Sequence, residues 1–398
     1  MTKRLTSWRA EARRSRLATS ATEDRAWPAT IGQDAAGHLP RRNLLAGGAA
    51  AVTAVLADAL PRPAIAAMRH VKFTLPWLAE GTSLFLIAGK AKGIYARHGI
   101  DIDISRGYGS MAAGQAVAAG QFEFNTMITT PTILLVAKGL PLVSIGVLDY
   151  DAGMGVGVLA DSPIAAPKML AGRKIGDVPT SAEFPFFPAY AKKAGFDIKT
   201  IQFANTDAKV LERVLAEKQV DAMTGIAASS LPIFISRKVP VRWMLYSSVG
   251  LPSYGGSLVT TKATLEKERA LCTAMAAATC ESLAFALTEP QEATALFLKA
   301  LPEMSLNPGI KEFLRVGLGL HDYAVAKPPA KQHGLGYADP KVLDGMVDLV
   351  MQYVATKDMK RPALNEWFDP EFGGKVKLSP AQWAEVDARV AGFGKLMS

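Results

Sequence analysis

The sequence predicts an α/β protein of two lobes, each a mostly parallel sheet flanked by helices, with a ligand cleft between the lobes. From residue 71 onward, short runs of β-type residues alternate with helical stretches, which is typical of this fold class. The alternation occurs twice, over residues 71–148 and again over residues 155–260. With 398 residues, 49% of them hydrophobic and only 20% charged, the chain is long enough for two domains with a large core.

The first series of elements lies before residue 150. Gly99 and Gly120 are expected to end helices. Ser110 is a suitable N-cap for one helix and Thr130 for another, which has Pro131 in its first turn, where proline fits. We expect strands at residues 71–75, 100–105, 122–127 and 142–148, and helices at 83–97, 111–119 and 130–138.

The second series begins near residue 155. One helix is placed after Phe184 and ends near Gly195, because Pro185 and Pro188 are tolerated only in a first turn. After residue 261 the pattern is almost entirely helical, which indicates packing layers rather than a separate catalytic module. We expect strands at residues 155–159, 174–177, 198–203, 221–223, 241–247 and 257–260, and a further helix at 207–218.

The layout predicts two lobes joined by two strand crossovers. Lobe I is expected to be discontinuous, with residues 68–152 plus 256–398. Lobe II, residues 153–255, is then an insertion into lobe I.

The N-terminal part of the chain has the organisation of an export signal. In residues 41–66, the pair Arg41-Arg42 precedes a short apolar stretch that is followed by Ala64-Ile65-Ala66, a small-x-small cleavage site. The paired arginines resemble a twin-arginine signal, while a Sec signal and an uncleaved anchor remain alternatives. An anchor is disfavoured because a span needs about 20 apolar residues. We therefore expect cleavage near Ala66 and a periplasmic protein, with residues 1–40 disordered or an overlong n-region from an upstream start codon.

The net charge of +9 does not indicate a nucleic-acid partner. Residues 1–66 carry ten Lys or Arg and five Asp or Glu, which is a net charge of +5 and leaves +4 for the remainder. That remainder has no Lys- or Arg-rich block and no basic stripe interleaved with aromatic residues. We therefore expect no nucleic-acid binding.

The sequence lacks the common motifs of enzymes and metal sites. It contains no Gly-x-Ser-x-Gly, His-Glu-x-x-His, Cys-x-x-Cys or phosphate-loop motif, and its histidines are isolated. Cys272 and Cys280 lie on one predicted helix, about 12 Å apart, beyond the reach of a disulfide. We therefore expect no catalytic residue, no metal, no cofactor and two reduced, buried cysteines.

Several segments resemble a known family. Residues 91–102 (AKGIYARHGIDI) are similar to its A-x-G-x-[YF]-x-x-x-G-[LI]-[DE]-[VI] segment, and residues 118–124 (AAGQFEF) to its A-x-G-x-[FLV]-[DE]-[FVI] segment. Residues 170–176 (LAGRKIG) resemble L-x-G-K-x-I-G, with Arg173 where lysine is usual, and residues 220–222 match V-D-A. These segments, which span most of residues 70–260, resemble the periplasmic solute-binding proteins of ABC importers, in the nitrate, sulfonate, taurine and thiamine-pyrimidine class.

The resemblance implies a type 2 periplasmic-binding fold and a role in uptake. A protein of this class closes like a clamshell on a small organic or anionic solute, here a sulfonate, a nitrate-like anion, a pyrimidine or an aromatic acid. It then delivers the solute to the membrane permease of an ABC importer, and we expect a monomer. Two alternatives remain, a periplasmic ligand-sensing subunit and an enzyme similar to thiamine-pyrimidine synthase, whose Cys-rich, iron-associated motif is absent here.

The candidate ligand-binding residues follow strands, because ligands of open α/β sheets bind beyond the carboxyl ends of strands. Trp77 could stack on a planar ligand or pack in the core. Ser110 could present its hydroxyl and backbone N–H groups to a polar or anionic edge, and could also be a plain N-cap. Glu183 could bind an amine or aminopyrimidine edge, or be a surface acid that complements a helix dipole. The remaining candidates are Tyr108, Gly109, Thr129, Thr130, Thr180, Ser181 and Thr224.

Overall fold

The computed structural model describes residues 68–397. The predicted signal peptide at residues 41–66 and the preceding residues 1–40 lie outside these residues. The fold therefore begins with the first strand that the sequence predicts.

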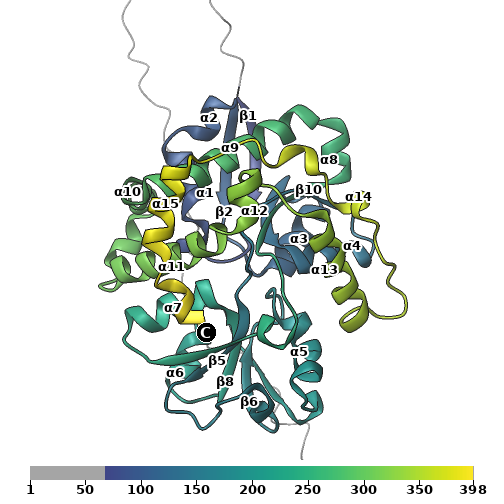
Figure 1. Ribbon diagram of the computed structural model, residues 1–398, viewed down its shortest axis with the longest axis vertical. Helices are drawn as coiled ribbons and strands as arrows, with labels where there is room; N and C mark the ends of the chain where they lie inside the picture. The colour runs from purple at the N-terminus through teal and green to yellow at the C-terminus, as the bar shows by residue number, and fades with distance from the viewer. Residues whose placement is uncertain (1–67, 398) are drawn as a thin grey trace, which may run out of the picture. The chain divides into compact units, whose positions relative to one another are not determined.

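The first sheet has five strands in the order β2-β1-β3-β10-β4 (Figure 1). β1 pairs in parallel with β2 and β3, whereas β10 is antiparallel to both β3 and β4. Four of the five strands thus point in one direction. The strands are β1 Arg69–Thr74, β2 Ile100–Ser105, β3 Phe124–Ile128, β4 Leu142–Val147 and β10 Gly256–Thr261.

The second sheet repeats this arrangement in the order β7-β6-β8-β5-β9. β6 is parallel to β7 and β8, and β5 is antiparallel to β8 and β9. The predicted fold class, an α/β protein with two mostly parallel sheets, is confirmed, while the residue boundaries of the two lobes stay a prediction. The strands are β5 Met154–Leu159, β6 Lys174–Asp177, β7 Gln202–Asn205, β8 Ala222–Ile226 and β9 Val241–Leu245.

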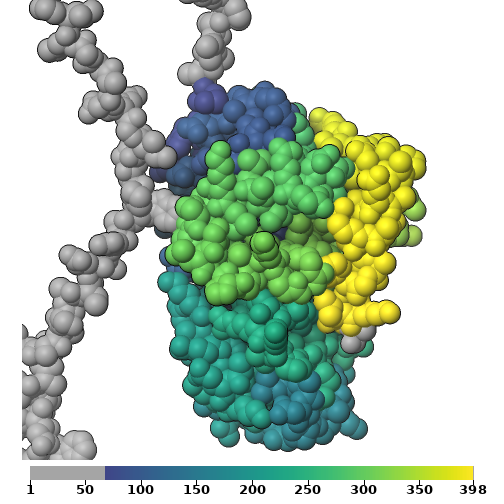
Figure 2. Space-filling view, turned by 90° about the vertical axis from the view of Figure 1, so that its left-hand side faces the viewer, coloured from purple at the N-terminus to yellow at the C-terminus, as the bar shows by residue number. Residues whose placement is uncertain are grey.

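Helices flank both sheets, and the C-terminal third of the chain is helical as predicted. Figure 2 shows residues of this third, green to yellow, bordering the teal residues of the second sheet's lobe along one face. The α-helices are α1 Leu84–Ala91, α2 Ile94–Arg97, α3 Ser110–Ala118, α4 Thr129–Ala137, α5 Phe187–Ala194, α6 Leu211–Ala216, α7 Ala227–Ser236, α8 Lys262–Lys267, α9 Arg269–Thr288, α10 Pro290–Ala300, α11 Ile310–Val325, α12 Pro328–His333, α13 Pro340–Tyr353, α14 Leu364–Trp367 and α15 Pro380–Val390. Short 3-10 helices are η1 Gly81–Ser83, η2 Pro167–Leu170, η3 Phe184–Phe186, η4 Ile198–Thr200, η5 Ser247–Val249, η6 Pro302–Leu306, η7 Pro370–Phe372 and η8 Phe393–Met397.

Three predicted elements differ from the structure. The predicted helix at residues 83–97 is divided into α1 and α2, because Gly93 between them has φ +76, the left-handed conformation that glycine adopts without strain. The predicted strand at 198–203 starts only at Gln202, since η4 precedes it, and the predicted helix at 207–218 is reduced to α6.

Helix α7 was not predicted. Its sequence contains Pro232, which removes a backbone donor and usually ends a helix. The helix persists because it packs along α11, and Leu231, Pro232 and Phe234 are buried. Tertiary packing here outweighs the local preference.

Helix α9 forms part of the core of the first sheet's lobe. Within residues 68–397 it is the one helix with the length and apolar composition to cross a membrane, but 56% of that span is buried inside the protein. It packs against α1 and α10. Cys272 and Cys280 on this helix are buried and free, as predicted. Their thiols act as packing groups.

The close contact between η1 and α11 yields a stability prediction. A Cβ atom on Gly81 would lie 2.5 Å from the backbone carbonyl carbon of Gly317, so Gly81→Ala must push two backbones apart. We expect a loss of about 1–3 kcal/mol in the free energy of unfolding, measured by denaturant titration. The matched control is Gly345→Ala in α13, where a Cβ meets nothing within 4 Å and should be neutral or stabilising. Equal effects of the two substitutions would contradict this account.

Candidate functional site

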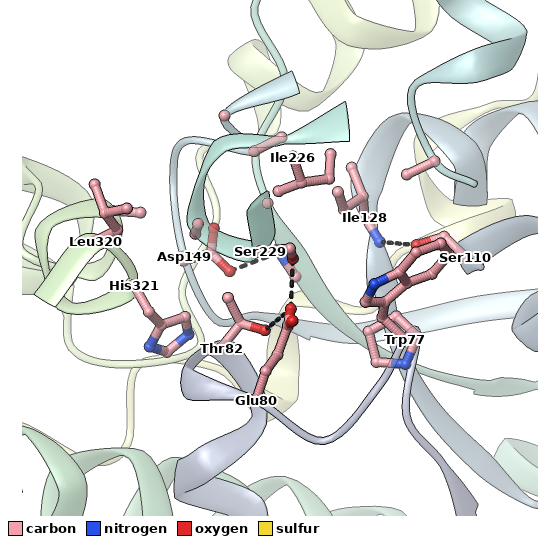
Figure 3. A pocket seen from close by; sticks show the side chains of 18 of the residues that line it. Trp77, Glu80, Thr82, Ser110, Ile128, Asp149, Ile226, Ser229, Leu320 and His321 are labelled. Atoms are coloured by element: carbon pink, nitrogen blue, oxygen red, sulfur yellow. Dashed lines mark hydrogen bonds between the residues drawn. The ribbon is translucent and has the colours of Figure 1, made fainter. Parts of the chain in front are cut away.

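A cavity of about 120 Å³ lies where the carboxyl ends of strands from both sheets meet. The first sheet's lobe, called lobe I below, contributes Trp77 after β1 and Ser110 after β2. The second sheet's lobe, called lobe II, contributes Glu183 after β6 and Ile226 at the end of β8. Figure 3 shows Trp77, Ser110 and Ile226 around the cavity. The position agrees with the rule that ligands of open α/β sheets bind beyond the strand ends.

One part of the cavity wall is apolar. Trp77 is partly buried, and Phe85 stacks on the ring of His321 with 5.3 Å between the ring centroids. Such a surface suits the carbon skeleton of a small solute. The other apolar lining residues with large side chains are Met127, Ile128, Leu148, Leu211, Ile226, Leu320 and Met397.

The polar part of the wall is acidic. Five carboxyl groups line the cavity, those of Glu80, Asp149, Asp151, Glu183 and Glu212. All but the partly buried Asp151 are at most 8% exposed. Within residues 68–397, none of the five is ion-paired with a Lys or Arg side chain, and no Lys or Arg lines the cavity.

Hydroxyl groups hold the two carboxyls of lobe II. Glu183 Oε1 accepts hydrogen bonds from Ser181 Oγ at 2.7 Å and from Thr224 Oγ1 at 3.0 Å. Glu212 Oε1 accepts one from Ser230 Oγ at 2.8 Å. Burial raises the pKa of Glu212 to about 7 and also raises the pKa of Glu183, because desolvation disfavours the charged form more than these hydrogen bonds favour it.

Glu80 belongs to lobe I and accepts hydrogen bonds from residues of both lobes. Its Oε1 accepts hydrogen bonds from Thr82 Oγ1 at 3.0 Å and from the hydroxyl of Ser229, which lies on α7 in lobe II (Figure 3). Burial raises the pKa of Glu80 to about 7. Asp149, directly after β4, accepts a hydrogen bond from Gly256 N at 2.7 Å, and burial raises its pKa to about 6.

Four of the predicted site residues line the cavity, namely Trp77, Ser110, Ser181 and Glu183. Ser110 Oγ accepts a hydrogen bond from Ile128 N at 3.3 Å. The predicted N-cap role of Ser110 is wrong, because α3 begins at Ser110 itself and Gly109 precedes it with φ 114, where glycine is favoured. Glu183 is 1% exposed, so it is not a surface acid.

Tyr108, Gly109 and Thr180 form a contact between the lobes instead of lining the cavity. The hydroxyl of Thr180 donates to the carbonyl oxygen of Tyr108 at 2.5 Å, while the Tyr108 side chain is 63% exposed and carries the Arg106 guanidinium over its ring. A Cβ atom on Gly109 would lie 1.9 Å from the carbonyl oxygen of Thr180, so this approach requires glycine.

Thr129, Thr130 and Thr224 are buried behind the cavity wall. Thr129 Oγ1 donates to the carbonyl oxygen of Gly255 at 3.0 Å, and Thr130 Oγ1 is bonded to Ser253 Oγ at 3.0 Å, so both tie α4 to the returning crossover. The predicted N-cap role of Thr130 is wrong, since α4 begins at Thr129. Thr224 acts on the cavity only through its hydrogen bond to Glu183.

Several cavity residues were missed by sequence reasoning. Glu80 and Asp149 follow β1 and β4 closely, so the strand-end rule could have found them. Glu212 lies inside a predicted helix and Ser229 on the unpredicted α7. His321, on α11, is far from the strand ends in sequence, and no local pattern marks it.

Comparison with known proteins places this site in context. The family described as NMT1/THI5 like matches residues 81–293. No curated protein sequence matches the chain. Among solved structures, the alkanesulfonate-binding protein SsuA of Xanthomonas axonopodis pv. citri, bound to MOPS, has a TM-score of 0.58 at 14% identity, covering 75% of this chain and 98% of its own.

Two further structures are similar to the same extent. The aliphatic sulphonate binding protein SsuA of Escherichia coli has a TM-score of 0.56 at 16% identity, covering 78% of this chain and 96% of its own. The nitrate-binding protein NrtA of Synechocystis PCC 6803 has a TM-score of 0.55 at 11% identity, covering 83% of this chain and 91% of its own. At identities this low, the structural similarity establishes a common fold and nothing about the ligand.

The buried carboxyls predict a pH dependence of stability. The pKa of Glu212 is about 7 in the folded protein and 4.5 ordinarily. The folded protein therefore binds the proton more tightly than the unfolded chain. The resulting stabilisation is complete below pH 4.5 and is lost as the pH rises to about 7. We expect the melting temperature to fall between pH 5 and pH 8, and Glu212→Gln to remove on the order of 3 kcal/mol of that dependence. The exposed Glu303→Gln is the control, and unchanged pH profiles for both variants would refute the assignment.

Proposed function

Because the chain belongs to the NMT1/THI5-like family, which matches more than half of its length, we propose that it is an exported solute-binding protein. It would capture a small solute in the periplasm by closing its two lobes and deliver it to the permease of an ABC importer. The fold shared with sulfonate-binding and nitrate-binding proteins supports this role. We further propose that the protein acts as a monomer and does not change the solute chemically.

The observation that carries the proposal is the construction of the cavity from both lobes. Each lobe supplies strand ends and carboxyl groups, so neither lobe alone encloses a solute. Two chain crossovers join the lobes, one between β4 and β5 and one between β9 and β10. Rotation about two such crossovers is the usual motion of a hinged binding protein.

Contacts between the lobes support closure as the binding event. Helix α7 of lobe II packs along α11, and Ser229 reaches across to Glu80. On another part of the interface, the ammonium of Lys193 on α5 lies 4.9 Å from the ring centroid of Tyr353 on α13. These contacts would form when the lobes close and break when they open.

A ligand panel tests the proposed function. We expect at least one small solute to raise the melting temperature of the full chain, because a ligand that binds only the folded state stabilises it by mass action. The panel contains taurine, alkanesulfonates, nitrate, aminopyrimidines, aromatic carboxylates and amines. Trp77→Ala, which removes the aromatic cavity wall, should abolish the shift, whereas Leu306→Ala, at a side chain that is 83% exposed, should not. Conversion of a solute to product would instead favour an enzyme.

The bond between Ser229 and Glu80 yields a prediction about closure. Ser229→Ala removes a hydrogen bond that joins the two lobes, which is worth about 1–2 kcal/mol. We expect the affinity for the solute found in the panel to fall about 5- to 30-fold in isothermal titration calorimetry, mainly through faster release. Ser248→Ala, at an exposed hydroxyl of lobe II, is the control. Equal affinities of the two variants would show that this bond does not hold the closed form.

A further inference from the structure

The charge of the cavity identifies the class of solute that it takes. Five carboxyl groups line it, while His321 is the only basic side chain among its described lining residues. An anion site needs the opposite arrangement, with Lys, Arg or unengaged N–H and O–H donors directed at the ligand. The polar wall of this cavity is therefore suited to a ligand that donates hydrogen bonds.

The hydroxyl groups of the cavity do not reverse this conclusion. A serine or threonine hydroxyl has one hydrogen to donate. The hydroxyls of Thr82 and Ser229 donate to Glu80, that of Ser181 donates to Glu183, and that of Ser230 donates to Glu212. These four hydroxyls have their hydrogens committed to carboxyl oxygens and present acceptor lone pairs to a solute, while Ser110, whose Oγ accepts from Ile128 N, keeps a hydrogen to donate.

The carboxyl groups surround the cavity instead of forming a patch on one side. Glu80 and Asp149 come from lobe I, and Glu183 and Glu212 come from lobe II. In the closed form all four are desolvated without a cation beside them, and a buried, unpaired carboxylate is strongly disfavoured. A positively charged solute would supply the missing partner to both lobes at once.

His321 gives a second, independent indication of a ligand. Its side chain is 4% exposed, and its Nδ1 atom lies 3.9 Å from Asp322 Oδ1 but has no hydrogen-bond partner among the residues that the structure describes. The ring is held flat against Phe85 and points toward Thr82 and Glu80 in Figure 3. Buried polar atoms are rarely left unsatisfied, and a polar group of a solute bound beside this ring would give it a partner.

The cation is organic rather than a metal ion. Within residues 68–397, no three His, Cys, Asp or Glu side chains are grouped so that they could hold a metal. The apolar wall around Trp77 and Phe85 also requires a carbon skeleton on the ligand, and an aromatic face near a cation adds a favourable electrostatic term.

We propose that the cavity binds an organic cation, a small solute with a protonated amine or amidine nitrogen on an apolar or planar body. This inference rests on the proposed solute-binding function. The ammonium or amidinium group lies between Glu80 and Asp149 of lobe I and Glu183 and Glu212 of lobe II. Trp77 and Phe85 contact the body.

Matched pairs of compounds test the proposal. We would measure melting temperatures and binding heats of the full chain with benzamidine, phenethylamine and 1,4-diaminobutane, and with the similarly shaped benzoate, 3-phenylpropionate and succinate. We expect at least one cation to bind and its anionic counterpart not to bind. Binding of an anion in preference to the cations would overturn the proposal but leave solute binding intact. A complete lack of binding by all compounds in this set and in the wider panel would refute both.

The number of protons exchanged on binding gives a second readout. The titratable groups facing the site are Glu80, Asp149, Asp151, Glu183, Glu212 and His321, with Arg237 and Asp177 acting from farther away. Burial raises the pKa of Glu80 and Glu212 to about 7 in the closed form, and a bound cation lowers both values again. Closure on a cation keeps these carboxyls ionised, so we expect calorimetry at pH 6 in two buffers of different ionisation enthalpy to show no net proton uptake on binding, whereas closure on a neutral or anionic solute takes up protons. Net proton uptake would contradict the proposal.

Two variants separate this role from a structural one. Glu183→Gln keeps the shape of the side chain and removes its charge, so we expect the affinity for the cation to fall about 30-fold or more. Without ligand, the same variant should melt at the same or a higher temperature than the native chain, because burial disfavours the charged carboxyl and the amide keeps its shape without the charge. Glu281→Gln, whose carboxyl pairs with Arg97 and His98 outside the cavity, should leave cation binding unchanged. Unaltered binding by Glu183→Gln would overturn the proposal.

Discussion

The paired crossovers are the feature on which the rest of the structure depends. Leu148 N donates to the carbonyl oxygen of Gly256 at 2.7 Å, and Gly255 N donates to that of Asp149 at 3.0 Å, so the outgoing and returning chains form one short ribbon. A Cβ atom on Gly255 would lie 1.6 Å from Asp149 Oδ1, so a larger residue there would displace this carboxyl group. This ribbon directs the strand ends of both sheets toward one cavity, and it fixes the carboxyl group of Asp149 in the wall of that cavity.

The sequence was sufficient for the fold because the alternation of strands and helices is a local pattern. It also placed Trp77, Ser110, Ser181 and Glu183 among the candidates that line the cavity, since each lies in a segment that follows a predicted strand. It did not reveal the charge of the cavity. Burial and partners depend on contacts between residues far apart in the chain, as in the bond between Ser229 and Glu80, which are 149 residues apart. The local sequence around either residue does not show that the two side chains lie close together in the folded protein.

The hydroxyl groups show why residue type at a strand end does not determine the polarity of a cavity. Serine and threonine at strand ends suggest donors for an anion, and Ser181 is in place to act as one. In the structure its hydrogen is directed at Glu183, two residues further along the same loop. A hydroxyl takes its role from the stronger acceptor nearby. Proteins that share this fold can therefore present opposite polarity to their ligands, and similarity to sulfonate-binding and nitrate-binding structures concerns the scaffold alone.

The unpaired carboxyls also connect selectivity to motion. In an open form, water would hydrate Glu80 and Glu183, and their charges would cost little. Closure removes that water, so a closed and empty cavity must take up protons, whereas a cavity holding a cation keeps its carboxylates ionised and paired. A ligand shifts a conformational equilibrium only by its difference in affinity for the two states. A positive charge on the solute supplies that difference, because its attraction to the carboxylates strengthens as the cavity loses water. In the proposed mechanism, the groups that recognise the solute therefore also determine whether the lobes close.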